Sequence, residues 1–273
     1  MEKLELPITC YKDTINISSL FFYFSLNLNV REEKETLDKY LVAICEGKGS
    51  NSSVDLAKKR LQRTFASKLA SEEKESSWIM GATSELYLHF LLNLLGFNQE
   101  FIYRNLEEKS IKKGFDGVYT DQKRRVWLLE SKSGSNKTKN ISHLSKIKEA
   151  YNDLSDKFSG KAEDNKIPND PWENALNHAK VVNSDESLKN KLKKLSDEYV
   201  SEVFHGTLEF NIIPCGTLFL MDENTSDKYD IEEIKEGIEN YVKDKEYKEI
   251  IIICSTQKSY ADFLDYIGVM HED

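Results

Sequence analysis

Two neighbouring segments in the middle of the chain, residues 114–120 and 125–133, combine strand-like apolar character with charged side chains. The first segment contains Asp116, and the second contains Glu130 and Lys132. Such side chains are almost never buried without a partner, because removing an unpaired charge from water is very costly. Three of them in the two most strand-like segments therefore indicate a charged site that is built into a sheet.

The two segments are predicted to form an antiparallel hairpin. Residues 121–125 between them are polar and suit a loop centred on Lys123. In a symmetric hairpin, residues whose numbers sum to twice the centre lie opposite each other, so Asp116 faces Glu130. Their Cβ atoms would lie roughly 4.5–5.5 Å apart, close enough for two carboxylates to share one divalent cation. Lys132 follows by two residues and lies on the same face.

Another interpretation of the same segments stays open. Asp116 could be an ordinary turn residue between Gly114 and Gly117. A loop shifted by one residue would also place the two carboxylates on opposite faces of the sheet. The Glu-x-Lys triplet alone is a weak signal, since such triplets occur in many helices and exposed strands. The apolar run at residues 126–129 before it favours a buried strand, and therefore favours the site.

The predicted set of groups suits metal-assisted hydrolysis of phosphodiesters. Asp116, Glu130 and the backbone carbonyl of Ser131 would hold Mg²⁺, or Mn²⁺ in its place, and water would complete the coordination shell. The ion would polarise the phosphate and lower the pKa of the attacking water. Lys132 would orient that water and offset the charge that develops in the transition state.

A further acidic residue, Glu85, lies in the most apolar helical segment, residues 79–95. Its leucine and phenylalanine neighbours cover much of the helix circumference, so the helix is expected to be buried and Glu85 to have a partner. We interpret it as a catalytic residue and a candidate metal ligand; a surface charge at the polar edge of the helix is the alternative. His89 follows one turn later and could reach the site, but it is interpreted as a packed or solvent-edge histidine.

Apolar periodicity along the rest of the chain predicts an α/β protein with a mixed central sheet flanked by helices. The predicted strands after residue 76 are 101–106, 114–120, 125–133, 212–221 and 249–254. The predicted helices are 79–95, 141–158, 172–182, 187–203, 231–242 and 260–267. We expect residues 76–273 to be the catalytic domain, with a helical insertion at about residues 159–204.

The first 75 residues are predicted to form a mixed N-terminal extension, which is a candidate for docking a partner. Residues 15–30 are rich in β-branched and aromatic side chains and indicate one or two strands. Apolar residues from Leu37 to Cys45 recur at helical spacing before Gly47, and a second helix follows from Val54 to Phe65.

The charge of the chain bears on its partners. The net charge is −9, which argues against a general nucleic-acid coating protein. Between residues 104 and 139, however, ten Lys or Arg stand against five Asp or Glu. Such a local excess suits a groove for phosphates. The candidate phosphate-binding lysines, for which a solvated surface is the alternative, are Lys113, Lys137, Lys139 and Lys146.

Cysteine usage and hydropathy exclude several classes of protein. The four cysteines are far apart and form no C-x-x-C pair, so neither a zinc site nor a disulfide framework is indicated. No apolar run comes close to the roughly 20 residues that a membrane helix needs. We therefore expect a cytoplasmic protein with reduced thiols, no membrane partner and no small-molecule cofactor.

The spacing of the charged residues resembles the PD-(D/E)XK nuclease superfamily, in which an acidic residue on a helix precedes a strand with Asp and a strand with Glu-x-Lys. The matching residues here are Gly81, Glu85, Asp116, Glu130, Ser131 and Lys132. Phe115 stands where the motif has its proline, a replacement that is common in this divergent group. The resemblance implies a restriction-endonuclease-like core and a deoxyribonuclease, with Glu85 as the helix-borne acid.

A closer likeness is to the HamA effector family of the Hachiman anti-phage systems. It is carried by residues 105–110, 113–117 and 127–133, and by the helix start at Gly81. The resemblance implies a DNA endonuclease that is held in check by a superfamily 2 helicase (HamB-like). An RNase of the same fold is one alternative, and a catalytically inert module that docks a helicase is another. The intact set of Asp, Glu and Lys argues against the inert module.

Overall fold

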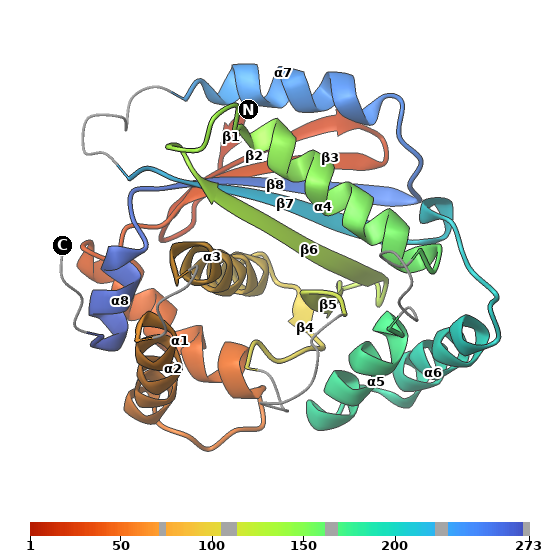
Figure 1. The fold of residues 1–273 in the computed structure, drawn as a ribbon, viewed down its shortest axis with the longest axis horizontal. Coiled ribbons are helices and arrows are strands. Elements are labelled where there is room, and N and C mark those ends of the chain that lie inside the picture. The colour runs from red at the N-terminus through yellow and green to blue at the C-terminus, as the bar shows by residue number, and fades with distance from the viewer. Residues whose placement is uncertain (71–74, 105–113, 162–168, 222–228, 270–273) are drawn as a thin grey trace.

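Eight strands form one mixed sheet in the computed structural model, which describes residues 1–70, 75–104, 114–161, 169–221 and 229–269 (Figure 1). Their order across the sheet is β1-β2-β3-β8-β7-β6-β5-β4. The strands are β1 (Glu2–Lys3), β2 (Thr9–Asn16), β3 (Ser19–Ser25), β4 (Asn98–Gln99), β5 (Gly117–Thr120), β6 (Val126–Ser135), β7 (Asn211–Phe219) and β8 (Glu249–Gln257).

Strand direction divides the sheet into a parallel centre and antiparallel margins. The strands β3, β8, β7 and β6 run parallel to their neighbours in that group. The pairs β1–β2, β2–β3, β4–β5 and β5–β6 are antiparallel. The central strands are buried on both faces, which explains why β7 and β8 are nearly continuous apolar runs.

Helices cover both faces of the sheet, as Figure 1 shows. One face packs against α1 (Arg31–Glu46), α2 (Val54–Leu69), α3 (Glu75–Leu94) and α8 (Ala261–Ile267). The other face packs against α4 (His143–Phe158), α5 (Pro171–Val181), α6 (Glu186–Val200) and α7 (Ile231–Val242). Alternate residues of each central strand enter the two cores: Leu129 packs on the α3 side, and Leu128 packs on the α4 side.

The predicted α/β architecture is confirmed at this level, and most predicted elements match within a few residues. Two helices, α5 and α6, occupy the segment predicted as a helical insertion, and they pack against each other. No helix in the described ranges is long and apolar enough to cross a membrane.

The strand predicted at residues 101–106 is wrong where the structure describes it. Phe101, Ile102 and Tyr103 are all buried, but their backbone is irregular, and residues 105–106 lie outside the described part. Their backbone groups find partners in helices: Tyr103 N–H donates to the carbonyl of Ile44 (3.0 Å), and Ile102 N–H donates to His178 Nδ1 (3.2 Å). The two-residue strand β4 pairs with β5 instead.

Residues 1–70 contribute three strands to the sheet and two helices to one of its faces. The strand β3 pairs with β8 over six residue pairs, from Ser19–Ile250 to Phe24–Ser255. The helices α1 and α2 share one apolar core with α3. Whether this segment also docks a partner stays a prediction.

Candidate active site

The hairpin that carries the charged residues forms in the predicted register. β5 and β6 pair from Gly117–Leu129 to Thr120–Val126, and every pair sums to twice 123. Asp121 stabilises the loop because its Oδ1 accepts the backbone N–H groups of Lys123 and Arg125, each at 2.9 Å. An Asp that bonds backbone two residues ahead is a common way to close a turn.

Asp116 lies just beyond the paired residues, at the point where β5 begins. Its N–H donates to the carbonyl of Leu129 (3.1 Å), and its Oδ2 accepts the N–H of Ser131 (2.8 Å). The Asp116 carboxylate thus accepts the N–H of Ser131 in place of a backbone carbonyl of a neighbouring strand. Gly117 follows where side chains leave no room, since a Cβ there would meet Tyr119 Cε2 at 2.9 Å.

Glu130 is the buried centre of a cluster of charged residues, which we call the Glu130 cluster: Asp116, Glu130, Lys132, Asp153 and Lys157. Its side chain is 3% exposed. It points to the α4 face, where Lys132 Nζ donates to its Oε1 (3.1 Å) and Lys157 Nζ donates to its Oε2. The pKa of Glu130 is raised to about 7: burial is the largest cause, the negative charge of Asp116 adds to the rise, and the two lysines oppose it.

Lys132 bridges two acids, because its ammonium also pairs with Asp153 of α4. Burial lowers the pKa of Lys132, but the charges of Glu130, Asp153 and Asp116 outweigh that effect and hold the pKa above its ordinary value. The side chain is 28% exposed, so the ammonium lies at the boundary between the buried acid and solvent. A charged donor in that position can reach a bound anion.

The structure therefore brings together Asp116, Glu130 and Lys132, and adds two residues that the sequence interpretation missed. Asp153 and Lys157 both come from α4, one turn apart. Together with Lys146 they form a charged stripe at helical spacing beside the buried stripe of that helix. This charged stripe was the sequence signal for Asp153 and Lys157. It could not be assigned to the site without knowing how α4 lies over β6.

Glu85 belongs to the helix on the opposite face of the sheet from Glu130. Its neighbour Ser84 bonds the hydroxyls of Ser131 (3.2 Å) and Thr217 (2.7 Å), which places this turn of α3 behind β6. The Glu85 carboxylate lies 3.7 Å from His89 Nε2. Its role as a catalytic residue or metal ligand stays a prediction.

His89 is packed, as the sequence indicated. It is fully buried on the α3 side and its Nδ1 contacts the hydroxyl of Tyr119. Burial, above all, raises the pKa of Tyr119 well above its ordinary value, with smaller contributions from Cys215 and then Glu85. The buried His89 and Tyr119 and the partly buried Glu85 therefore lie together behind the hairpin.

The predicted phosphate-binding lysines differ in their surroundings. Lys137 and Lys139 are exposed in the turn that follows β6. Lys146 forms an ion pair with Glu149, at 2.8 Å to its Oε2, and its side chain is only 16% exposed. Lys113 lies outside the described residues. Lys137 and Lys139 are therefore placed more openly than Lys146.

The donor atoms at the hairpin suit Mg²⁺ in kind, because hard cations take oxygen ligands and Mg²⁺ keeps several waters. Among the described residues, no group of three His, Cys, Asp or Glu is placed to hold a metal. A metal here would use Asp116 and Glu130, with carbonyl, water and phosphate oxygens as the other ligands. After burial, Asp116 is what most raises the pKa of Glu130, as expected of two acids that face one position.

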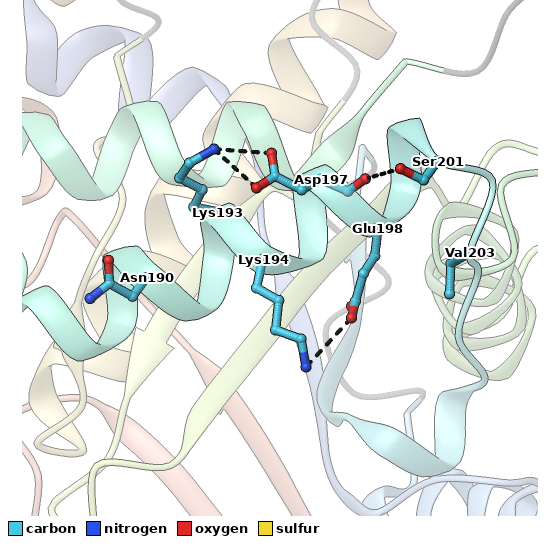
Figure 2. Close-up of a pocket in the computed structure, with 7 residues that line it drawn as sticks. All are labelled: Asn190, Lys193, Lys194, Asp197, Glu198, Ser201 and Val203. Atoms are coloured by element: carbon cyan, nitrogen blue, oxygen red, sulfur yellow. Dashed lines mark hydrogen bonds and ion pairs between the residues drawn. The ribbon is translucent and has the colours of Figure 1, made fainter.

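A surface hollow of about 550 Å³ lies along α6 and is separate from this cluster (Figure 2). Its charged residues neutralise each other: Lys193 pairs with Asp197 (3.0 Å), and Lys194 pairs with Glu198 (3.4 Å). None of the charged residues of the hairpin lines it. The buried Glu130 cluster, rather than this hollow, is therefore the candidate site.

Comparison with known protein families and with curated proteins gave no match to this chain.

Proposed function

We propose that this protein is a Mg²⁺-dependent DNA endonuclease of the PD-(D/E)XK type. The observation that supports the proposal is the convergence of Asp116, Glu130 and Lys132 where β5 begins and β6 runs on to Ser135. The pairing of β6 with β5 ends at Leu129, so the remainder of β6, from Glu130 to Ser135, extends beyond the end of β5. A mixed sheet with helices on both faces is compatible with such a nuclease core.

Each group has a defined task in the proposed reaction. Mg²⁺ supplies Lewis acidity and a bound water of lowered pKa. Asp116 and Glu130 would hold the ion through carboxylate oxygens, and the N–H of Ser131 fixes the orientation of the Asp116 carboxylate. Lys132 orients the attacking water and offsets the negative charge that develops on the phosphate. Its contact with Glu130 sets the position of the ammonium.

The proposed setting is anti-phage defence, with a superfamily 2 helicase as the controlling partner. This part of the proposal rests on the resemblance to the HamA family. The net charge of −9 is compatible with a surface that faces a protein partner as well as DNA.

Supercoiled plasmid tests the proposed activity. We expect nicking and linearisation with Mg²⁺ and none with EDTA. Glu130→Gln and Lys132→Met should each lower the rate at least about 100-fold, because each removes a charge at the reacting phosphate. Lys193→Met and Asp197→Asn break an exposed ion pair on α6 and should retain the activity. Unchanged cleavage by Glu130→Gln would contradict the proposal.

Substrate class and defence role need separate measurements. Matched DNA and RNA duplexes distinguish a deoxyribonuclease from an RNase of the same fold. Phage protection by a Glu130→Ala, Lys132→Ala double variant distinguishes an enzyme from an inert docking module, provided that the helicase complex still assembles. We expect DNA cleavage and loss of protection.

A further inference from the structure

Lys157 contacts the same buried carboxylate as the lysine of the motif. Its Nζ donates to Glu130 Oε2, while Lys132 donates to Oε1. Lys157 lies in the last turn of α4, and its side chain is 22% exposed. Its ammonium also lies 6.0 Å from the centre of the Phe115 ring. Both oxygens of Glu130 are therefore held by ammonium groups.

The two lysines are bound differently. Lys132 is shared between Glu130 and Asp153, so it keeps a partner if Glu130 turns to another ligand. Among the described residues, the ion-pair partner of Lys157 is Glu130. A divalent cation at Glu130 needs a carboxylate oxygen, and Lys157 is the ammonium that can leave most simply, toward the solvent at its partly exposed end.

Charge in the cluster also matters for a cation. Three acids, namely Asp116, Glu130 and Asp153, face two ammonium groups. Removing Lys157 would make the cluster more negative by one charge, and nearby negative charge favours a bound cation. An ammonium group in contact with a ligand oxygen weakens the binding of a cation there.

We propose that Lys157 is a positioning residue that holds Glu130 in place before metal binds and competes with Mg²⁺ for its carboxylate. This inference rests on the proposed function, because it takes Glu130 to be a metal ligand. Lys157 keeps the buried carboxylate paired without a metal, and its departure is part of metal binding. The metal affinity of the protein is accordingly lower than the acids alone would give.

Calorimetric titration of the full chain with Mg²⁺ tests the competition. We expect Lys157→Met to lower the Kd for Mg²⁺ about three- to tenfold. The change is expected to be modest because solvent screens a partly exposed charge. Lys157→Arg keeps the charge and should stay near the native value. Lys193→Met is the matched control on α6 and should also be unchanged. An equal or higher Kd for Lys157→Met would overturn the proposal.

Thermal unfolding provides a second readout that needs no activity. In EDTA, Lys157→Met should melt below the native protein, because Glu130 loses one of its two partners. Mg²⁺ should raise the Tm of this variant more than that of the native chain. If Lys157→Met fails to fold, Lys157→Gln serves in both measurements.

The outcomes separate the two proposals. Metal binding of equal strength in the native chain and the Lys157 variants would overturn the competition and leave the nuclease proposal standing. No Mg²⁺ binding by any of them would overturn the metal site itself, and the competition with it.

Discussion

Glu130 and His143 are buried titratable residues at opposite ends of α4: Glu130 contacts Lys157 in its last turn, and His143 is its first residue. Burial moves each toward its neutral form: it raises the pKa of Glu130 to about 7 and lowers the pKa of His143 to about 4. The sequence identified Glu130 from its neighbours along the strand. His143 had no spacing that marked it, because its burial depends on the packing of α4 against β8.

We predict that His143 makes the fold sensitive to acid. Its Nε2 contacts the carbonyl of Ser255 (3.1 Å) and the hydroxyl of Thr256 (3.0 Å), and the ring packs between Tyr23 and Tyr229. Because the folded pKa is below the unfolded one, its contribution is complete above pH ~6.5 and is lost as the pH falls toward about 4.

Denaturant unfolding of the native protein and of His143→Gln between pH 7.5 and 4.5 measures this effect. The native free energy of unfolding should fall by up to ~3 kcal/mol more than that of the variant, since each unit of pKa difference is worth about 1.4 kcal/mol. Parallel curves for the two proteins would show that His143 does not titrate in this window.

At the scale of elements, periodicity and turn chemistry predicted the helices and the hairpin, but they could not predict two kinds of feature. The segment at residues 101–104 is apolar like a strand, yet its backbone bonds go to helices that are distant in sequence. Asp153 and Lys157 look like ordinary polar positions of an amphipathic helix. Their contact with Glu130 depends on how α4 crosses the sheet, which local sequence does not encode.

The start of the hairpin is predicted to be intolerant of any side chain at Gly117. A Cβ there would meet Tyr119, Leu129 and His89 at 2.9–3.2 Å. Gly117→Ala should cost about 1–3 kcal/mol of stability, because the buried rings have little room to move. It should also lower plasmid cleavage by displacing Asp116.

Gly81 is the matched control for this substitution. It lies within α3, and a Cβ there would meet nothing within 4 Å. Gly81→Ala should leave stability unchanged or raise it by up to ~1 kcal/mol, since Ala favours a helix more than Gly does. Chemical denaturation of both variants checks the pair, and equal effects would contradict the packing argument.

At the scale of the whole molecule, residues 1–70 complete the sheet and both of its cores. Strand periodicity predicted strands there, but it did not reveal that β3 pairs with β8 at the other end of the chain. Phe21 and Phe24 of β3 are fully buried on opposite faces. The N-terminal segment and the hairpin should therefore unfold together.

We predict that Phe21→Ala destabilises the entire protein by about 3–5 kcal/mol, the usual cost of removing a buried phenylalanine. All three tryptophans, Trp78, Trp127 and Trp172, lie outside the first 75 residues. Their fluorescence transition should shift together with the circular dichroism transition. Ile17→Ala, at a fully exposed position, should change neither. If Phe21→Ala left the tryptophan fluorescence transition unchanged, the N-terminal segment would unfold independently of the rest.

The pairing of β3 with β8 has a consequence for biosynthesis. The β2–β3 hairpin is synthesised well before its parallel neighbour, β8. Until β8 has been synthesised, this hairpin presents an open edge of aromatic residues. The sheet can close only after β8 has been synthesised, and such non-local pairing is slow. A nascent chain truncated before β8 leaves that edge available to other chains and should aggregate.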